Sequence, residues 1–202
     1  MAPAAREPIT STIRDEDWDD RDITDQSFEL TLFDDVDMTG SRIGMCVFAR
    51  CTFRNVRFNA AMVTATAFTN CTFVRCSYFD ATFDGCKVVG STFERCTFST
   101  MTVTGGDWSF TSLTRADLRG VRFANLRMRE ADLTDIRAEG ASIRDTDLSG
   151  ATLQGANLTT CDLRGSDLST IDPTTVRLRG AIIGWQQAVQ LAQGLGLEVA
   201  PD

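Results

Sequence analysis

The sequence predicts an all-β solenoid built from four-sided coils and ending in a short helical tail. Three observations lead to this prediction. Apolar residues recur every five positions over most of the 202-residue chain, small residues recur with the same period two positions earlier, and a helical period replaces the period of five after Pro173.

The five-residue register runs from Trp18 to Leu168 without a polar interruption. A period of five fits neither a helix, with a period of 3.6, nor a strand, with a period of two. It suits a coil with four sides, each made of one short extended segment and a turn, so that twenty residues complete one coil. The register residues then all point to a common axis. They are Trp18, Ile23, Phe28, Phe33, Met38, Ile43, Phe48, Phe53, Phe58, Val63, Phe68, Phe73, Tyr78, Phe83, Val88, Phe93, Phe98, Val103, Trp108, Leu113, Leu118, Phe123, Met128, Leu133, Ala138, Ile143, Leu148, Leu153, Leu158, Leu163 and Leu168.

The second register, two positions before the first, carries small residues and all the cysteines of the chain. The cysteines are Cys46, Cys51, Cys71, Cys76, Cys86, Cys96 and Cys161. We interpret them as small buried thiols that fill space beside the large core residues. Cys51 with Cys71, and Cys76 with Cys96, would stack on successive coils about 4.8 Å apart, a separation that also permits a disulfide. The cytoplasmic location expected below favours free thiols.

The N-terminal segment has no periodicity in residues 1–15, where we expect a flexible leader. The acidic stretch that follows places Asp15, Asp17 and Asp19 at the spacing of the first three ligands of a calcium loop. However, Asp20 stands where that loop needs glycine, and Gln26 stands where it needs glutamate. The sequence therefore favours a solvated acidic cap, and we expect no metal site.

Charge and composition exclude several classes of function. The net charge is -8, and residues 1–40 hold 12 acids and 3 bases, a net of -9. We therefore expect no direct binding to nucleic acid, which requires clustered Lys and Arg. The chain has no histidine, and a filled solenoid offers no pocket, so we expect no enzyme, no catalytic residue and no cofactor. Without a signal segment or a long apolar span, a cytoplasmic protein without membrane contact is expected.

Two outward-facing features interrupt the acidic surface. Arg75, Arg95 and Arg115 recur every twenty residues and should form a basic column on successive coils. A modest apolar patch is predicted on other sides. Its residues are Met45, Met62, Ala65 and Phe79.

The tail begins where Pro173 occupies the register position and removes a backbone donor; Leu178 and Ile183 then return briefly to the register. Trp185, Ala188, Val189 and Ala192 follow at i, i+3, i+4 and i+7, which predicts a short helix that ends at Gly194, followed by a short apolar strand over 195–199. An open solenoid end needs a cover, and the apolar residues of the tail exceed what one cap requires. We therefore predict a C-terminal homodimer. Its interface residues are Trp185, Val189, Leu191, Ala192, Leu195, Leu197 and Val199.

The repeated pentapeptides carry a family resemblance. ADLRG at 116–120, ADLTD at 131–135 and CDLRG at 161–165, together with CTF at 51–53, 71–73 and 96–98, resemble the A(D/N)LXX signature of the pentapeptide repeat family. The resemblance implies a right-handed quadrilateral β-helix. The expected domain plan is a flexible leader at 1–15, a pentapeptide-repeat β-helix at 16–170, and a C-terminal cap and dimerisation segment at 171–202.

Within that family, an uninterrupted array followed by WQQAVQLAQGLGL at 185–197 resembles the MfpA/Qnr quinolone-resistance group. This resemblance implies a DNA-mimicking dimer that binds DNA gyrase, competes with duplex DNA, and modulates the enzyme or protects it from fluoroquinolones or similar poisons. Two alternatives remain open at this point. One is a generic protein-interaction scaffold or adaptor without gyrase activity, and the other is a self-immunity factor in a natural-product cluster.

The acidic residues are the candidate partner-binding site, because the first forty residues carry the net charge of -9. The first group is Asp19, Asp20, Asp22, Asp25, Glu29, Asp34, Asp35 and Asp37. A weaker second group is Asp117, Asp132, Asp135, Glu139 and Asp145.

Overall fold

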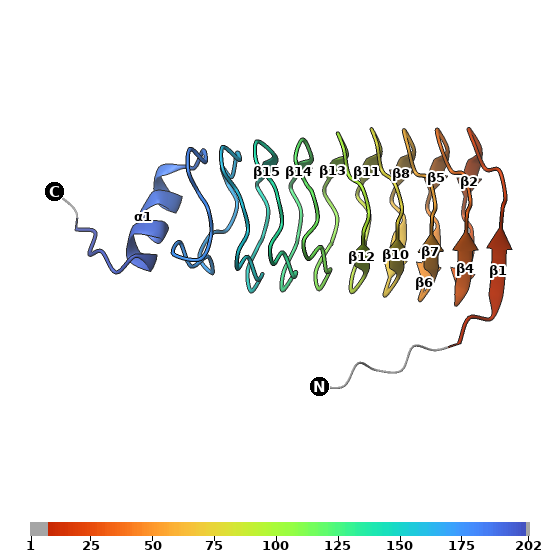
Figure 1. Ribbon diagram of the computed structural model, residues 1–202, viewed down its shortest axis with the longest axis horizontal. Coiled ribbons are helices and arrows are strands. Elements are labelled where there is room, and N and C mark those ends of the chain that lie inside the picture. Colours follow the sequence, from red (N-terminus) through yellow and green to blue (C-terminus); the bar gives the residue numbers. More distant parts are fainter. Residues whose placement is uncertain (1–7, 201–202) are drawn as a thin grey trace.

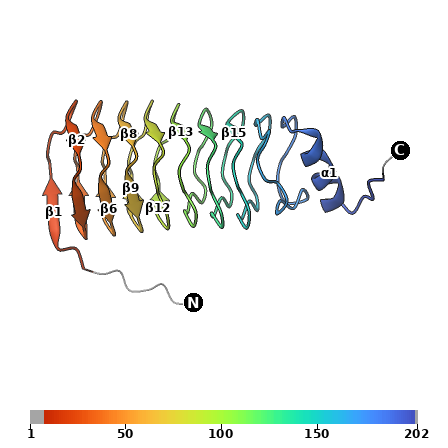
Figure 2. The ribbon, with the colours of Figure 1, turned by 180° about the vertical axis from the view of Figure 1, so that it is seen from behind.

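The protein is a rod of stacked coils with a helix across its C-terminal end (Figure 1). The computed structural model describes residues 8–200. The view from behind shows the same single stack, with β1 (Ser11–Arg14) at one end and α1 (Trp185–Gly194) at the other (Figure 2). All strand pairs are parallel, which confirms the predicted β-solenoid with a short C-terminal helix. In the described region, no helix combines the length and the apolar character needed to span a bilayer.

The strands form three parallel sheets, one along each of three sides of the rod, which we call sides A, C and D. Side A comprises β1 (Ser11–Arg14), β4 (Thr31–Asp34), β7 (Thr52–Arg54), β10 (Thr72–Val74) and β12 (Thr92–Glu94). Side C comprises β2 (Asp22–Thr24), β5 (Arg42–Gly44), β8 (Met62–Thr64), β11 (Thr82–Asp84), β13 (Thr102–Thr104), β14 (Arg122–Ala124) and β15 (Ser142–Arg144). Side D comprises β3 (Ser27–Glu29), β6 (Val47–Ala49) and β9 (Ala67–Thr69). Side B, between A and C, is joined by single bridges such as Asp17 to Asp37.

Each coil takes twenty residues, because every strand pairs with the residues twenty positions later. Phe33 pairs with Phe53, for example, and Phe83 pairs with Val103. The turn at each corner is a residue in the left-handed region. Every fifth residue from Asp15 to Gly165 has a φ between +46° and +79°. Most of these corner residues are not glycine, although left-handed backbone is unfavourable for them. The regular ladder on both sides of each corner is what holds the backbone in this conformation.

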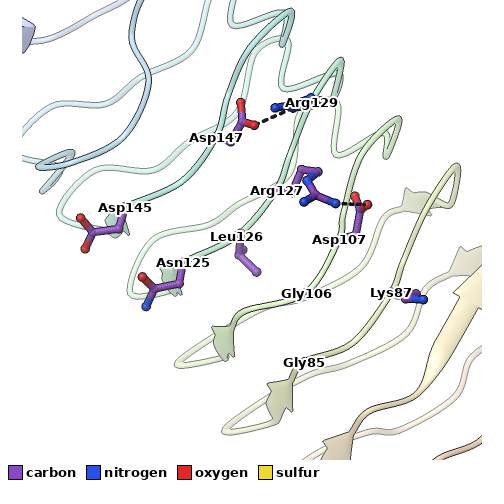
Figure 3. A pocket seen from close by; sticks show the side chains of 10 residues that line it. All are labelled: Gly85, Lys87, Gly106, Asp107, Asn125, Leu126, Arg127, Arg129, Asp145 and Asp147. Atoms are coloured by element: carbon purple, nitrogen blue, oxygen red, sulfur yellow. Dashed lines mark hydrogen bonds and ion pairs between the residues drawn. The ribbon is translucent and has the colours of Figure 1, made fainter.

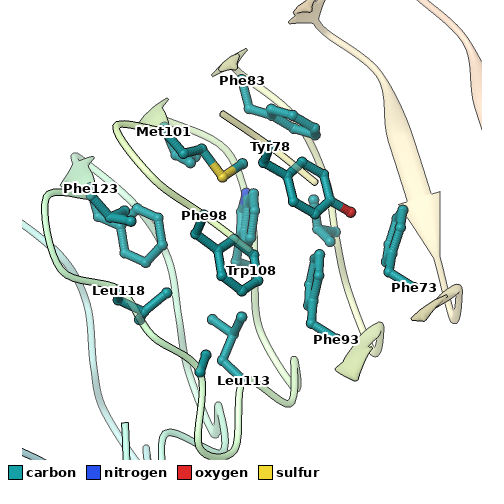
Figure 4. Packing of buried hydrophobic residues seen from close by; sticks show 14 of the residues in the cluster. Phe73, Tyr78, Phe83, Phe93, Phe98, Met101, Trp108, Leu113, Leu118 and Phe123 are labelled. Atoms are coloured by element: carbon teal, nitrogen blue, oxygen red, sulfur yellow. The ribbon is translucent and has the colours of Figure 1, made fainter. Parts of the chain in front are cut away.

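The register residues fill the axis of the rod, and all of them are buried except the half-buried Phe28. In the N-terminal half, aromatic rings stack from coil to coil: Phe53 lies 4.8 Å from Phe73, and Phe73 lies 4.7 Å from Phe93, measured between ring centroids. Figure 4 shows the aromatic stack giving way to Leu113 and Leu118. The core residues therefore change from mainly aromatic in the first half of the rod to mainly aliphatic in the second half. Side chains fill the solenoid as they fill a globular core.

The limits of the solenoid differ from those predicted. The leader predicted over 1–15 is wrong for its last residues, because Ser11–Arg14 pairs in register with Thr31–Asp34 and Ile13 packs against the core; residues 1–7 lie outside the described residues. At the other end, the boundary at residue 170 is too early. Bridges from Asn157 to Arg177 and from Asp162 to Ile182 continue the ladder beyond Pro173. Backbone pairing thus extends past both ends of the uninterrupted apolar register.

The helix α1 closes the C-terminal end of the rod. It begins at Trp185 and ends at Gly194, as predicted, but a different face touches the solenoid. Gln187 is buried and donates hydrogen bonds of 2.7 Å to the carbonyl oxygens of Leu163 and Ser166, while Leu191 packs against the core. The amide thus pairs with the carbonyl of Ser166 and adds a second donor to the carbonyl of Leu163, which also accepts from the amide of Ser166 at 3.1 Å. The strand predicted over 195–199 is wrong, since the described backbone there forms no ladder.

Candidate functional site

Four carboxylates of the first predicted group are exposed and form no ion pair within residues 8–200: Asp19, Asp20, Asp25 and Asp35. They lie on the first two coils. Desolvation and the neighbouring charges of Asp20, Asp37 and Asp17 raise the pKa of Asp19, as expected when several carboxylates share one end of the rod. This end therefore carries four exposed carboxylates that no ion pair among residues 8–200 neutralises.

The other acids of the first group are paired with arginines one coil away. Asp22 lies 3.6 Å from Arg42, and Asp37 lies 2.6 Å from Arg57. Glu29 pairs in the same way with Arg50. The hydrogen bond from Arg57 is the main cause that lowers the pKa of Asp37. The acidic first forty residues are thus partly neutralised by the basic coils that follow, and the sequence count of charges overstates the free negative charge.

Asp34 is a correction to the predicted surface. Its side chain is only 6% exposed, and it accepts hydrogen bonds from Arg54 at 2.6 Å and from Arg14 at 2.9 Å. The hydrogen bond from Arg54 is the largest cause that lowers the pKa of this carboxyl. Asp34 therefore joins neighbouring strands of side A, and its buried carboxylate is poorly accessible to a partner protein. The twenty-residue stacking brings Arg14, Asp34 and Arg54 together, and the charge count of the first forty residues did not take this pairing into account.

The second predicted group is spread over three sides and is mostly engaged. Asp117 lies 2.6 Å from Arg119 and 2.9 Å from Arg137, and the hydrogen bond from Arg119 is the main cause that lowers its pKa. Hydrogen bonds or ion pairs hold three other members as well. These are Asp132 with Thr114 and Thr134, Asp135 with Arg115 at 3.8 Å, and Glu139 with Asn157 at 2.6 Å. Asp145 is exposed and has no ion pair among the described residues. The structure does not gather this group into one site.

An open groove of about 820 Å³ lies along the corner between sides C and D (Figure 3). Gly85 faces open space, since no atom lies within 4 Å of the place a Cβ would take, whereas Gly106 packs against the backbone of Cys86, where a Cβ would clash. One wall holds two ion pairs, Arg127 with Asp107 at 3.1 Å and Arg129 with Asp147 at 2.6 Å. Sequence reasoning missed this groove, although glycine at corner positions 85 and 105 on successive coils was a readable signal. Residues lining it include Lys87, Asn125, Leu126 and Asp145.

Exposed apolar side chains lie where the repeat period placed them. Met45 is 59% exposed, Met62 is 52% exposed and Phe79 is 59% exposed, which confirms their predicted outward position. Val47 and Phe110 are also exposed and were not predicted. Val47 lies on side D beside Met45, so the apolar surface at the corner between sides C and D is larger than expected.

The basic column also faces out. Arg75, Arg95 and Arg115 are exposed at corner positions with left-handed backbone. Arg75 donates a hydrogen bond of 2.7 Å to Asn55, whose amide donates one of 2.9 Å to Asp35. A chain of hydrogen bonds thus connects the first arginine of the basic column to the acidic residue Asp35 at the same corner of the rod.

The predicted dimer residues divide into two sets. Trp185 is 76% exposed and Leu197 is 59% exposed, and Leu195 and Val199 also face solvent. The other set is partly buried on α1 and comprises Val189, Leu191 and Ala192. The tail therefore caps its own chain with one face and leaves an apolar surface on the other. In the part of the chain that the structure covers, no cluster of three or more His, Cys, Asp or Glu side chains has the arrangement of a metal site.

Comparisons with known proteins agree with this geometry. Residues 76–153 match the model described as "Pentapeptide repeat region". A search of curated protein sequences finds no significant match. Among solved structures, a trypsin-treated form of QnrB1, a plasmid-mediated fluoroquinolone resistance protein, superposes with a TM-score of 0.67 at 21% identity, covering 94% of this chain and 99% of the other. Full-length QnrB1 gives a TM-score of 0.50 at 18% identity, covering 92% and 100%.

A third similar structure is HetL, a pentapeptide repeat protein involved in heterocyst differentiation regulation in the cyanobacterium Nostoc sp. strain PCC 7120. It gives a TM-score of 0.48 at 19% identity and covers 89% of this chain and 90% of that chain. Residues 76–153 are thus a pentapeptide repeat region, and the chain folds as a β-helix of the kind found in solved pentapeptide repeat proteins.

Proposed function

We propose that this protein is a DNA mimic that binds DNA gyrase or a related type II topoisomerase, competes with duplex DNA, and modulates the enzyme or protects it from fluoroquinolones or similar poisons. The observation that carries the proposal is the set of exposed carboxylates on the first coils of a rod that form no ion pair within residues 8–200: Asp19, Asp20, Asp25 and Asp35. QnrB1, which shares the fold, is a fluoroquinolone resistance protein, and this supports the same direction.

The charge density of the rod decides how closely it can imitate the electrostatic field of duplex DNA. Successive coils repeat about every 4.8 Å, whereas duplex DNA carries one charge per roughly 1.7 Å of its axis. A net charge of -8 is therefore far below that of DNA of equal length. Binding would depend on the local field of the N-terminal coils and would weaken as salt screens it.

A homodimer through the C-terminal segment is the second part of the proposal. Trp185, Leu195, Leu197 and Val199 leave an apolar surface at the end of the rod opposite the acidic coils. Joining two copies there would cover this surface and place an acidic tip at each end of a rod of twice the length. Such a rod presents two equivalent tips to a twofold-symmetric enzyme.

A gyrase supercoiling assay tests the mimicry, with a DNA-cleavage assay in the presence of a fluoroquinolone alongside it. The test variant is Asp20→Asn with Asp25→Asn, and the matched control is Asp80→Asn with Asp84→Asn, which removes the same charge from exposed positions on the middle coils. We expect the test variant to require at least about tenfold more protein for the same effect, since two charges at one contact are lost. Equal potency of the wild type and both variants would rule out these acids.

An adaptor without gyrase activity is the second candidate, because Met45, Met62 and Phe79 are exposed in the middle of the rod. The same assays separate the two. Absence of any effect of the wild-type protein on supercoiling and on drug-induced cleavage at micromolar concentration would favour the adaptor.

A further inference from the structure

We propose that Cys96 and Cys76 form a peroxide-sensitive thiol pair, in which Cys96 is oxidised first and the two residues then join as a disulfide between adjacent coils. This inference is independent of the proposed binding to gyrase. It rests on the stacking of the two thiols, on an opening in the backbone ladder beside Cys96, and on a second cysteine pair that lacks the opening.

The two cysteines occupy the same position of the repeat on successive coils of side B. The residues that follow them, Ser77 and Thr97, form a parallel bridge, and the amide of Thr97 donates to the carbonyl of Cys76 at 3.0 Å. Neighbouring positions of a parallel ladder lie about 4.8 Å apart, within the Cα separation of roughly 4.4–6.8 Å that a disulfide spans. A disulfide therefore needs only a small movement of the two side chains.

The thiols also interact with each other. Burial is the main cause that raises the pKa of Cys76 well above its ordinary value, and its interaction with Cys96 is the next. The Cys76 thiol donates to the carbonyl of Phe53 at 3.4 Å, and the Cys96 thiol donates in the same way to the carbonyl of Phe73 at 3.5 Å, so the two sulfur atoms hold equivalent positions on successive coils. The thiolate is the reactive form of a cysteine, and only a thiol within reach of solvent meets an oxidant in that form.

The backbone ladder is open on the far side of Cys96. One coil below, the amide of Tyr78 donates to the carbonyl of Thr97 at 2.9 Å. The equivalent bonds one coil higher, from Phe98 to Asp117 and from Asp117 back to Cys96, are absent from the described backbone. No bridge joins these two segments, although bridges hold side B on the preceding coils. The gap coincides with the change in the core from Phe98 to Leu118.

This gap gives solvent access to one thiol. A cavity of about 250 Å³ is lined there by Cys96, Thr97, Phe98, Ser99, Asp117 and Arg119. Cys96 is the cysteine that is not fully buried, and the other six are buried. The cavity is many times larger than a water molecule, whose share of liquid volume is about 30 Å³, so a peroxide molecule of similar size fits in it.

Cys51 and Cys71 provide a natural comparison within the same chain. They too lie twenty residues apart, and their thiols donate to carbonyl oxygens in the same way, Cys51 to Phe28 at 3.4 Å and Cys71 to Phe48 at 3.3 Å. Both are only 1% exposed, and the ladder is closed on the far side of Cys71, where the amide of Thr92 donates to the carbonyl of Cys71 at 2.9 Å. The two pairs therefore share stacking and differ in access.

The chemistry balances with a peroxide as the oxidant. The thiolate of Cys96 attacks one peroxide oxygen, so that an S–O bond forms, the O–O bond breaks, and the second oxygen leaves and is protonated to water. The sulfur of Cys76 then attacks the sulfur of Cys96, forming the S–S bond as the S–O bond breaks. The proton of Cys76 leaves with the hydroxyl group as a second water. Two thiols and one hydrogen peroxide yield one disulfide and two waters.

The test is peroxide treatment of the folded full-length protein, followed by alkylation, tryptic digestion and mass spectrometry without reductant. Trypsin places Cys76 in residues 76–87 and Cys96 in residues 96–115, while Cys51 lies in 51–54 and Cys71 in 58–75. Because Cys86 shares a peptide with Cys76, fragmentation spectra or a Cys86→Ser background identify the bonded residue. We expect the 76–96 disulfide to form at least about tenfold faster than a 51–71 disulfide, because reactivity follows access.

Two variants separate the steps. Cys76→Ser should leave Cys96 as a sulfenic acid that dimedone labels, and Cys96→Ser should leave Cys76 reduced. Cys51→Ser is the matched control and should oxidise at positions 76 and 96 like the wild type. The wild-type comparison stands even where a variant folds poorly. A 51–71 disulfide formed as fast as the 76–96 disulfide, a wild-type Cys96 that stays reduced, or one that accumulates as sulfenic acid would each overturn the proposal.

Discussion

The carboxylate of Asp34 lies 2.6 Å from the guanidinium of Arg54, and its side chain is only 6% exposed although its neighbour Asp35 faces solvent. Arg14, from the first strand, reaches the same carboxylate from the other side at 2.9 Å. These two ion pairs connect β1 to the two coils that follow and hold the first strand on the end of the solenoid.

Replacing Asp34 should loosen that end. Asp34→Asn removes charge-assisted hydrogen bonds from both arginines, and we expect the free energy of unfolding to fall by about 1–3 kcal/mol. Urea unfolding measures it. The control is Asp35→Asn, which makes the same change of charge at the exposed neighbouring residue. It should change the free energy of unfolding by less than about 0.5 kcal/mol. If the two substitutions lowered the free energy of unfolding equally, the buried ion pairs of Asp34 would not be the cause of the loss.

Truncation in the aromatic stack should be far more costly. Phe73 lies between Phe53 and Phe93 at centroid distances of 4.8 and 4.7 Å. Because neighbouring coils are held in register by the backbone ladder, they collapse little around a hole, and Phe73→Ala should cost about 3–5 kcal/mol. The exposed Phe79 provides the comparison: Phe79→Ala should be nearly neutral in the same thermal or urea titration. A small effect at Phe73 would mean that the coils repack.

Tyr78 is expected to behave in the opposite way. Its ring is fully buried, and its hydroxyl has no hydrogen-bond partner in the described structure. Burying an unpaired hydroxyl is unfavourable, and burial also raises the pKa of the phenol. Tyr78→Phe keeps the stacking with Phe98 and should increase the free energy of unfolding by about 1 kcal/mol. A loss of stability would show that the hydroxyl has a partner in solution, such as a trapped water.

Acid should destabilise the rod over a defined range. Hydrogen bonds from Ser149 and, next, from Arg129 lower the pKa of Asp147 to about 2. A carboxyl whose folded pKa lies below its unfolded value of about 3.9 stabilises the fold above that value and loses the contribution as the pH falls toward the folded pKa. The urea midpoint should therefore drop between about pH 4 and pH 2. Asp147→Asn should make this drop shallower, and an identical profile would contradict its role.

The apolar end of the rod predicts a concentration-dependent dimer. Trp185→Glu or Leu197→Glu places a charge on the exposed face of the tail without touching Gln187, which holds α1 to the solenoid. We expect analytical ultracentrifugation to detect dimers of the wild type and monomers of these variants, because a charge buried in an apolar interface is strongly unfavourable. Met62→Glu, on the middle of the rod, is the control and should leave the dimer intact. A monomeric wild type would refute the interface.

The sequence by itself determined the solenoid, its core and the place of every cysteine. Each depends on a strict local period: a side chain at every fifth position must point inward if each five-residue side is one extended segment and one turn. The same period predicted that Met62 and Phe79 face out, and the helical spacing after Pro173 predicted α1.

Only the tertiary structure decided which side chains stacked across coils are buried, paired or free. Asp34 and Asp35 are neighbouring acids in the sequence, yet Asp34 is buried between arginines twenty residues away on either side, whereas Asp35, at a corner, is exposed and forms no ion pair among the described residues. Gln187, a polar residue between the predicted apolar positions, anchors α1 because the helix end places its amide against the carbonyls of Leu163 and Ser166 on the last coil. The opening beside Cys96 is likewise a property of how two coils stack, since its repeat is equivalent to that of Cys76 in the sequence. Long-range hydrogen bonds and ion pairs decide such differences, and a five-residue period does not encode them.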